Sequence, residues 1–197
     1  MAGDESRNPW TVRGERRVFD NPWIAVDERD VVNPAGRPAV YAVVRFKKLA
    51  VGVAPIDAEG RVRLVGQWRF PLGRYSWEIP EGGGDPGETP AETARRELAE
   101  ETGLSAGALR EILRMDLSNS VTDEEAVIFL AHDLTPGAAA PEETEILSQR
   151  AIPFREALEM AVSGAIRDSL TVAGLLRAHH MAVTGALDPA LTKAMLG

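Results

Sequence analysis

Alternating hydrophobic and polar residues in the first third of the chain predict β-strands. Two such runs, residues 23–26 and 39–44, flank a turn signal at 33–36, and together they predict an antiparallel hairpin. Two further hydrophobic runs, at 49–54 and 62–67, are separated by a second turn signal that ends in glycine. The first half of the chain is therefore expected to be rich in strands.

The spacing of hydrophobic residues becomes helical at Thr89. Thr89 and Glu92 have the spacing of a capping box, and Pro90 occupies the first helical position, where its missing N–H is tolerated. Gly103 is placed to end the helix in a left-handed conformation. The residues that can form the buried stripe of this helix are Ala91, Ala94, Leu98 and Ala99.

The last part of the chain predicts one more strand and two more helices. The strand is expected at 125–131, and the helices at 154–162 and 169–184. Helices that follow strands in a short domain indicate a layered architecture. We therefore predict an α/β (α+β) fold, with a mixed β-sheet sandwiched between helices and an N-terminal antiparallel β element.

The composition fits a globular protein in which oxygen atoms would be the main metal ligands. The chain has 197 residues, of which 44% are hydrophobic and 26% charged, as in ordinary globular domains. It contains no cysteine and only three histidines, so a bound metal ion would be held mainly by carboxylate or carbonyl oxygens.

The net charge and the sequence of the N-terminus argue against nucleic-acid binding, membrane association and secretion. A net charge of −8 argues against nucleic acid and acidic membranes, because phosphate groups attract basic surfaces. The N-terminus lacks the basic start and the hydrophobic run of a signal peptide, and no segment approaches the roughly 20 hydrophobic residues of a membrane span. We expect a cytoplasmic protein with no nucleic-acid partner and no membrane partner.

Acidic residues are concentrated between residues 78 and 101, and a solvated helix face is the ordinary explanation of such a run. Glu97, Glu100 and Glu101 favour another explanation, because their i, i+3, i+4 spacing puts three carboxylates on one helix face. In the last turn, the helix dipole disfavours each of them by roughly 0.3–1 kcal/mol. Bound Mg²⁺ would stabilise this face and could bridge substrate phosphates.

The segment that contains these glutamates resembles the Nudix box, and every fixed position of that motif is filled. The matching residues are Gly82, Glu88, Arg96, Glu97, Leu98, Glu100, Glu101, Gly103 and Leu104. A motif specified at so many positions is much more specific than a lone glycine-rich motif. The resemblance extends over residues 45–180, and it implies the Nudix fold and hydrolysis of a nucleotide with Mg²⁺, or Mn²⁺, as cofactor.

The resemblance also implies roles for residues of the motif. The metal ligands would be Glu81, through its backbone carbonyl, and Glu97, Glu100 and Glu101, of which Glu101 is also a catalytic candidate. The structural positions would be Gly82, Glu88, Arg96 and Gly103. Arg96 and Glu88 would brace the loop and helix through an ion pair, with direct substrate contact as the alternative.

Residues 67–82 resemble the Q-x-R…E-(L/I/F)-P-x-G segment of ADP-ribose and nucleoside diphosphate sugar pyrophosphatases. This similarity implies that Arg69 contacts the diphosphate and offsets charge during catalysis. It implies that Glu78 contacts the nucleotide or its metal ions. A simple ion pair between Arg69 and a neighbouring acid is the alternative.

The N-terminal hairpin resembles the element that this subgroup exchanges across a homodimer. The exchange would bring Trp23, Tyr41 and Arg45 to the base and diphosphate in the neighbouring subunit, and ordinary core packing is the alternative. Asn119 stands where ADP-ribose enzymes carry proline, which weakens ADP-ribose in favour of GDP-mannose or another nucleoside diphosphate sugar. Asn119 could bind a sugar or form an ordinary turn.

An acidic loop precedes the helix expected at 154–162. Glu143 aligns with the proposed general base of ADP-ribose pyrophosphatases, and Glu145 aligns with a second acid near their metal ions. A carboxylate at such a position can activate water bound to a metal. A loop with exposed acids, Glu142 included, is the alternative.

Together these features predict a Nudix hydrolase with three parts: residues 1–47 as a dimer-forming β element, 48–185 as the hydrolase domain and 186–197 as a C-terminal tail. The expected reaction is metal-dependent hydrolysis of the diphosphate bond of ADP-ribose or a similar nucleoside diphosphate sugar, such as GDP-mannose. The products would be a nucleoside monophosphate and a sugar phosphate. The alternatives are a nucleotide-sugar sensor without turnover and a Nudix pyrophosphohydrolase for another nucleotide, such as RNA, which the acidic composition disfavours.

Overall fold

A computed structural model of the chain describes residues 7–139 and 146–197. Contacts within the chain divide it into two units. The first unit contains the N-terminal part up to Lys48 together with Asp116–Glu125, and the second contains Leu49–Met115 and Ala126–Gly197. None of the helices in the described residues is long and hydrophobic enough to span a membrane.

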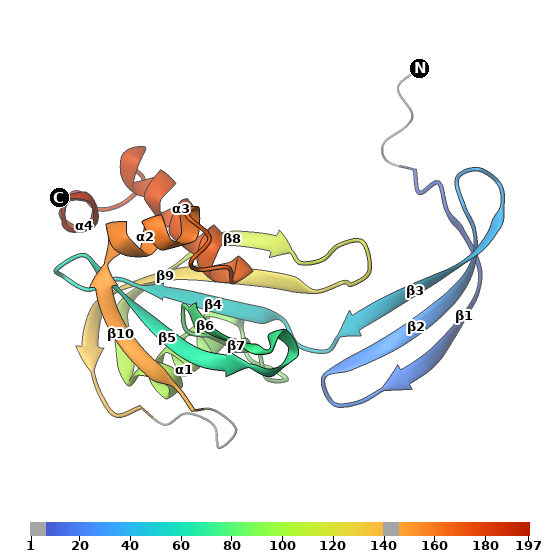
Figure 1. Cartoon of the computed structure of the whole chain (residues 1–197), viewed down its shortest axis with the longest axis horizontal. Coiled ribbons are helices and arrows are strands. Elements are labelled where there is room, and N and C mark those ends of the chain that lie inside the picture. Colours follow the sequence, from blue (N-terminus) through green and yellow to red (C-terminus); the bar gives the residue numbers. More distant parts are fainter. Residues whose placement is uncertain (1–6, 140–145) are drawn as a thin grey trace. The chain divides into compact units, whose positions relative to one another are not determined.

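The first unit is built on a three-stranded antiparallel sheet with the order β1-β2-β3 (Figure 1). Its strands are β1 (Thr11–Asp20), β2 (Ile24–Val32) and β3 (Pro38–Phe46). The predicted hairpin is confirmed, because β2 and β3 pair along their full length. Asn33 closes the turn by accepting hydrogen bonds from the backbone N–H groups of Ala35 and Arg37, each at 3.0 Å.

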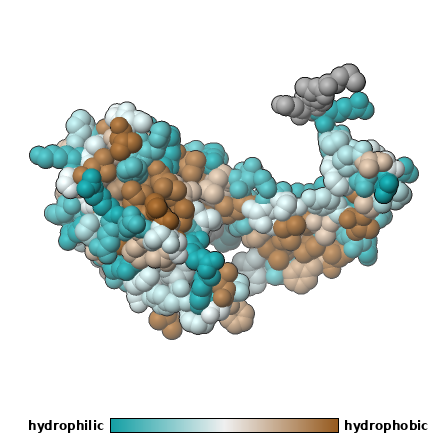
Figure 2. Space-filling view, turned by 45° about the horizontal axis from the view of Figure 1, so that its top comes forward, coloured by the Kyte–Doolittle hydropathy of each residue, from teal (hydrophilic) through white to brown (hydrophobic). Residues whose placement is uncertain are grey.

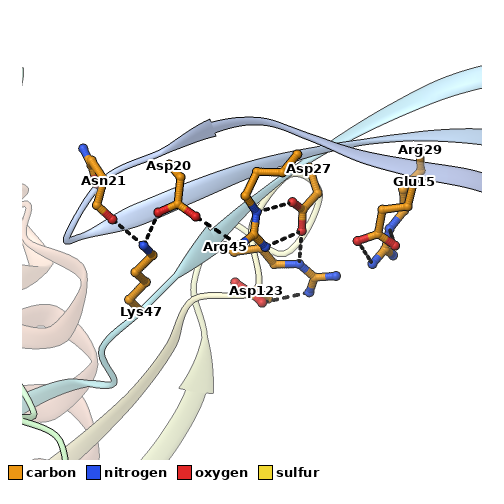
Figure 3. Close-up of polar contacts among 9 residues, drawn as sticks. Glu15, Asp20, Asn21, Asp27, Arg29, Arg45, Lys47 and Asp123 are labelled. Atoms are coloured by element: carbon orange, nitrogen blue, oxygen red, sulfur yellow. Dashed lines mark hydrogen bonds and ion pairs between the residues drawn. The ribbon is translucent and has the colours of Figure 1, made fainter.

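Strand β1 was not predicted from the sequence. Nearly all of its residues are exposed, so it lacks the alternation that marks a half-buried strand. Cross-strand ion pairs connect it to β2, including Arg17 with Asp27 at 2.8 Å and Glu15 with Arg29 at 3.1 Å (Figure 3). Such pairs supply part of the stabilisation that hydrophobic contacts supply elsewhere.

The second unit contains two sheets, with the orders β10-β5-β6 and β7-β4-β9-β8. Their strands are β4 (Ala50–Pro55), β5 (Arg61–Arg69), β6 (Arg74–Glu78), β7 (Glu81–Gly83), β8 (Leu104–Asp116), β9 (Glu125–Pro136) and β10 (Ser148–Pro153), and the 3₁₀ helix η1 (Phe70–Leu72) connects β5 to β6. Strand β4 is parallel to β9 and antiparallel to β7. The predicted mixed sheet is therefore confirmed.

Helices cover both faces of the sheet that contains β4 (Figure 1). Helix α1 (Pro90–Thr102) lies on one side, and α2 (Phe154–Val162) and α3 (Ser169–Val183) lie on the other. Val51 and Val53 of β4 belong to one hydrophobic cluster with Leu98 of α1. Gly52 faces Leu170 of α3 instead, and a Cβ there would lie 3.2 Å from that side chain. Successive residues of β4 thus face α1 and α3 in turn, and the sheet lies between helices as predicted.

The predicted helix boundaries agree closely with the structure. Thr89 caps α1 in a capping box with Glu92, and Gly103 ends the helix at a φ of 71°. Residues 186–197, expected to form a tail, contain the short helix α4 (Pro189–Leu196). Its Met195 is buried and the helix contacts α2 and α3. A helix this short depends on tertiary packing, which a local pattern does not reveal.

Candidate active site

Two carboxylates of α1 are buried against the short strand β7. Gly82 leaves room for one of them, because a Cβ at this position would lie 2.1 Å from Oε1 of Glu97. The backbone N–H of Glu81 donates to Oε2 of Glu101 at 3.2 Å. Glu97 and Glu101 are 8% and 1% exposed, whereas the side chain of Glu100 is 34% exposed. The glycine of the motif therefore has a steric function.

Arg96 connects the acidic residues of the motif. It donates two hydrogen bonds to Glu88, at 2.9 and 3.0 Å, and one each to Glu97 and Glu100, at 2.7 and 3.0 Å. These bonds from Arg96 are the main reason that the pKa of Glu88 falls to about 2. The ion pair expected between Arg96 and Glu88 is thus present, and it links the loop before α1 to the helix.

Arg69, the predicted diphosphate contact, pairs with two acids. Its Nε and Nη2 donate to Glu78 at 2.5–3.0 Å, and Nη2 also donates to Glu81 at 2.9 Å. Burial would lower the pKa of Arg69, but the hydrogen bonds to Glu78 and the charge of Glu81 outweigh it and raise the pKa. Among the described residues, Nη1 has no hydrogen bond, and 32% of the side chain is exposed. The ion pairs therefore leave the Nη1 group of the guanidinium for a ligand.

Three carboxylates converge beside Arg69. Oxygen atoms of Glu78, Glu81 and Asp168 all lie within 4.8 Å of one another. Oε2 of Glu81 is buried and has no hydrogen-bond partner among the described residues. Burial, together with the charges of Asp168 and Glu78, raises the pKa of Glu81 well above its usual value. Hard divalent cations prefer such oxygens, so the residues present fit a metal ion.

The sequence interpretation did not include Asp168, and it gave Glu81 only a backbone role. Asp168 immediately precedes α3 and caps it, so the sequence contains a signal for the helix start. No local pattern indicates that this helix start lies beside β7. The convergence of Asp168 with Glu78 and Glu81 arises from the tertiary fold.

Two of the residues predicted to contact the base and diphosphate make polar contacts inside the first unit. Arg45 donates to Asp123 at 2.8 Å and to Asp27 at 3.4 Å (Figure 3). The hydroxyl of Tyr41 donates to the backbone carbonyl of Ser120 at 2.6 Å. The contacts with Asp123 and Ser120 connect β3 to the segment between β8 and β9, and the contact with Asp27 connects β3 to β2. These side chains therefore stabilise the unit in addition to any contact with a ligand.

The other two ligand-binding candidates, Trp23 and Asn119, are exposed. Trp23 is 68% exposed and does not belong to the buried core. Asn119 is exposed within a turn in which the Thr122 hydroxyl donates to the Leu117 carbonyl at 2.9 Å. The rings of Trp10 and Tyr41 form a T-shaped pair, with centroids 5.3 Å apart, beside a surface cavity of about 240 Å³.

The predicted general base lies outside the described residues. Glu143 and Glu145, with Glu142, belong to residues 140–145. Their predicted roles therefore stay predictions.

Comparisons with known proteins show which family this chain resembles. The NUDIX domain family matches residues 46–170, and the nucleoside diphosphate sugar hydrolase N-terminal domain family matches residues 10–44. A CMP-5'-(N-acetyl-N-hydroxy-3-aminopropyl)phosphonate hydrolase of Streptomyces rubellomurinus is 34% identical over 85% of this chain and 81% of its own length. An ADP-ribose pyrophosphatase of Mycobacterium tuberculosis is 35% identical over 82% of this chain and 79% of its own length. A solved structure described as an ADP compounds hydrolase covers 93% of this chain and 100% of its own, with a TM-score of 0.82 and 23% identity.

The fold, the filled motif and these matches define a metal-dependent hydrolase of the Nudix class, and the chain belongs to the Nudix hydrolase family. Within that family it carries the N-terminal domain of the nucleoside diphosphate sugar hydrolases. The predicted family, enzyme class and fold are confirmed.

Proposed function

We propose that the protein hydrolyses the diphosphate bond of a nucleoside diphosphate sugar, ADP-ribose or a similar compound such as GDP-mannose. The products are a nucleoside monophosphate and a sugar phosphate. The observation that carries the proposal is the position of Arg69, which binds Glu78 and Glu81 through Nε and Nη2 and leaves Nη1 for a ligand. A site that binds a diphosphate and its metal ion needs a positively charged group, such as this guanidinium, close to carboxylates that bind the metal ion.

The relatives support the substrate class, but they do not identify the nucleobase of the substrate. Their names refer to a CMP conjugate in one case and to ADP-ribose in the other. Both compounds contain a nucleotide joined to a second group. The match of residues 10–44 to the nucleoside diphosphate sugar hydrolases supports a sugar as that second group.

The proposed cofactor is Mg²⁺, with Mn²⁺ as the alternative. Glu97, Glu100, Glu101 and the carbonyl of Glu81 are the proposed ligands, and the cluster of Glu78, Glu81 and Asp168 supplies further oxygens. When bound, a divalent cation lowers the pKa of coordinated water and neutralises phosphate charge. Arg69 binds the diphosphate and offsets negative charge that develops on it, and the buried carboxylates on β7 and α1 would hold the cation.

The remaining roles are proposed from the resemblance. Glu143 is the proposed general base and Glu145 a further ligand. Trp23, Tyr41, Arg45 and Asn119 are proposed to contact the base or the sugar, in a homodimer formed by the N-terminal β element of residues 1–47. The hydrolase domain is proposed to begin at residue 48. The cytoplasmic location and the absence of a nucleic-acid partner stay predictions.

The test is hydrolysis of a substrate panel by the purified protein with Mg²⁺. The panel contains ADP-ribose, GDP-mannose, ADP-glucose, UDP-glucose, NADH and a dinucleoside polyphosphate, and phosphate products are measured directly. Glu101→Gln should abolish most of the metal-dependent rate, because it removes a buried carboxylate next to the Glu81 backbone. Glu111→Gln is the matched control, because Glu111 is exposed on β8 and pairs only with Arg114 among the described residues.

Turnover of a nucleoside diphosphate sugar that is lost in Glu101→Gln and kept in Glu111→Gln would support the proposal. Binding of these compounds, measured by calorimetry, without any turnover would contradict it and favour a sensor. An equal rate in both variants would show that the metal assignment is wrong.

A further inference from the structure

The start of helix α3 is capped in a way that differs from an ordinary N-cap. Oδ2 of Asp168 accepts a hydrogen bond from the backbone N–H of Thr171 at 2.7 Å, which is the usual capping contact. The same oxygen also accepts a hydrogen bond from the Thr171 hydroxyl at 2.7 Å. Asp188, the N-cap of α4, accepts only from backbone N–H groups among the described residues. Helix capping alone therefore does not explain why the hydroxyl of Thr171 donates a hydrogen bond to Asp168.

That hydroxyl has a second partner, which lies outside the helix. Thr171 is 0% exposed, and its Oγ1 accepts a hydrogen bond from the backbone N–H of Ile79 at 2.9 Å. The two residues are 92 positions apart in the sequence. The hydroxyl thus accepts from Ile79 and donates to Asp168, and the three groups form a relay of two hydrogen bonds, which is buried at Ile79 and partly buried at Asp168.

Ile79 lies between the two acids that hold Arg69. It directly follows Glu78 and stands two residues before Glu81, and it is fully buried. Its side chain is closely packed, because a Cβ added at Gly52 would lie 3.0 Å from it. A hydrogen bond to its N–H fixes the peptide plane that joins it to Glu78. The relay therefore limits how far the carboxylate of Glu78 can move relative to Arg69.

We infer that Asp168 and Thr171 are positioning residues, which hold the Glu78–Glu81 segment so that Arg69 faces the diphosphate. The inference rests on the proposed function, because it assigns the relay to the same site. Side chains that bind a substrate must be held to within about half an ångström, and buried hydrogen bonds behind them provide this order. Asp168 acts here through Thr171, in addition to any contact with a cation.

The hydroxyl of Thr171 can be tested with two matched variants. Thr171→Ser keeps the hydroxyl, whereas Thr171→Val keeps the shape and removes it. We expect kcat/KM of Thr171→Val to fall by about tenfold or more, mainly through a higher KM, as is usual for residues that orient a binding group. Thr171→Ser should stay close to the wild type. Equal kinetics in the two variants would overturn the inference.

A second measurement tests the hydrogen bonds of the relay in the absence of substrate. Hydrogen exchange of the Ile79 amide, observed by NMR, should be faster in Thr171→Val than in Thr171→Ser, while amides in β4 and β9 keep their protection. Unchanged protection of the Ile79 amide would contradict the relay. This result does not depend on the substrate, so it separates a failure of the inference from a failure of the proposed function, which would appear as an inactive wild type.

Asp168→Ala and Asp188→Ala provide the comparison if Thr171→Val does not fold. Both changes remove the side-chain N-cap of a C-terminal helix, and only Asp168 is connected to Ile79 through Thr171. Hydrogen exchange of the Ile79 amide should be faster in Asp168→Ala and unchanged in Asp188→Ala, and this readout does not depend on a bound cation. Equal exchange of the Ile79 amide in both variants would overturn the inference.

Discussion

At the scale of single residues, the two arginines of the candidate active site differ in how many of their N–H groups are used. Arg96 donates to three glutamates of the motif and to the Gly83 carbonyl, so its role within the site is to hold other residues. Arg69 donates to Glu78 and Glu81 through one edge only. This difference supports the proposed structural role of Arg96 and the proposed substrate contact of Arg69.

Replacing Arg69 by lysine tests this assignment. Lysine keeps the charge but loses the planar fork, so it cannot hold both acids and a phosphate at once. We expect kcat/KM of Arg69→Lys to fall on the order of a hundredfold, as for the loss of one preorganised donor. Arg74→Lys, on the neighbouring strand β6, is the matched control and should stay near the wild type. Steady-state kinetics with the best substrate of the panel would decide, and equal values in both variants would exclude substrate contact by Arg69.

Glu88 makes stability depend on pH. Its pKa in the folded protein is about 2, compared with an ordinary value of 4.5, because Arg96 binds the ionised form. The ionised carboxylate therefore stabilises the folded state above pH 4.5, and this contribution is lost as the pH falls toward 2. We expect Glu88→Gln to lower Tm at pH 6 and to flatten the decrease of Tm between pH 4.5 and 2. Parallel Tm curves for the variant and the wild type would contradict this explanation.

At the scale of secondary-structure elements, the sequence predicted correctly those features that depend on residues close together in the chain. The capping box at Thr89 and the glycine at 103 marked α1 correctly, because both are satisfied within a few residues. Likewise, the i, i+3, i+4 spacing identified the acidic face of α1. Strand β1, strand β8 and helix α4 were not predicted. Strand β1 is exposed along its length, and α4 is held by packing. The place of Asp168 beside Glu81 depends on residues far apart in the sequence, and no pattern in the sequence marks it.

The packing of α4 can be tested at a glycine that precedes it by more than a hundred residues. Gly60 has a φ of 73°, and a Cβ there would lie 1.9 Å from the backbone oxygen of Ala194. Gly36 has a φ of 75° with nothing within 4 Å, so Gly36→Ala measures the backbone strain alone. We expect Gly60→Ala to lose about 1–3 kcal/mol more unfolding free energy than Gly36→Ala, as α4 is displaced. Equal losses in denaturant titrations would mean that α4 is not held at Gly60.

At the scale of the whole molecule, the first unit has several exposed hydrophobic side chains on one face of its sheet. Phe19, Val40 and Phe46 are 49%, 61% and 38% exposed, and strand pairing puts them on one face of the β1-β2-β3 sheet. Figure 2 shows hydrophobic side chains gathered on this unit. A surface of this kind is typical of a protein interface. It supports the proposed homodimer.

Light scattering with size exclusion tests the dimer. We expect a mass of twice 21.3 kDa for the wild type and a shift toward the monomer for Val40→Glu, because a carboxylate cannot be buried there without a partner. Val162→Glu is the matched control, since Val162 is 65% exposed on α2 in the other unit. If the wild type has the mass of one chain, the dimer proposal is wrong.

The first unit is assembled from two separate stretches of chain, and this arrangement sets an order of events during synthesis. The hairpins of β1, β2 and β3 involve neighbours in the sequence, so they can form as soon as the first 48 residues have left the ribosome. The hydrogen bond from Tyr41 to Ser120 spans 79 positions and must wait for α1 and β8. The ribosome thus completes the first unit only after Leu49–Met115 of the second unit has been made, and until then the three-stranded sheet lacks the contacts of Asp116–Glu125.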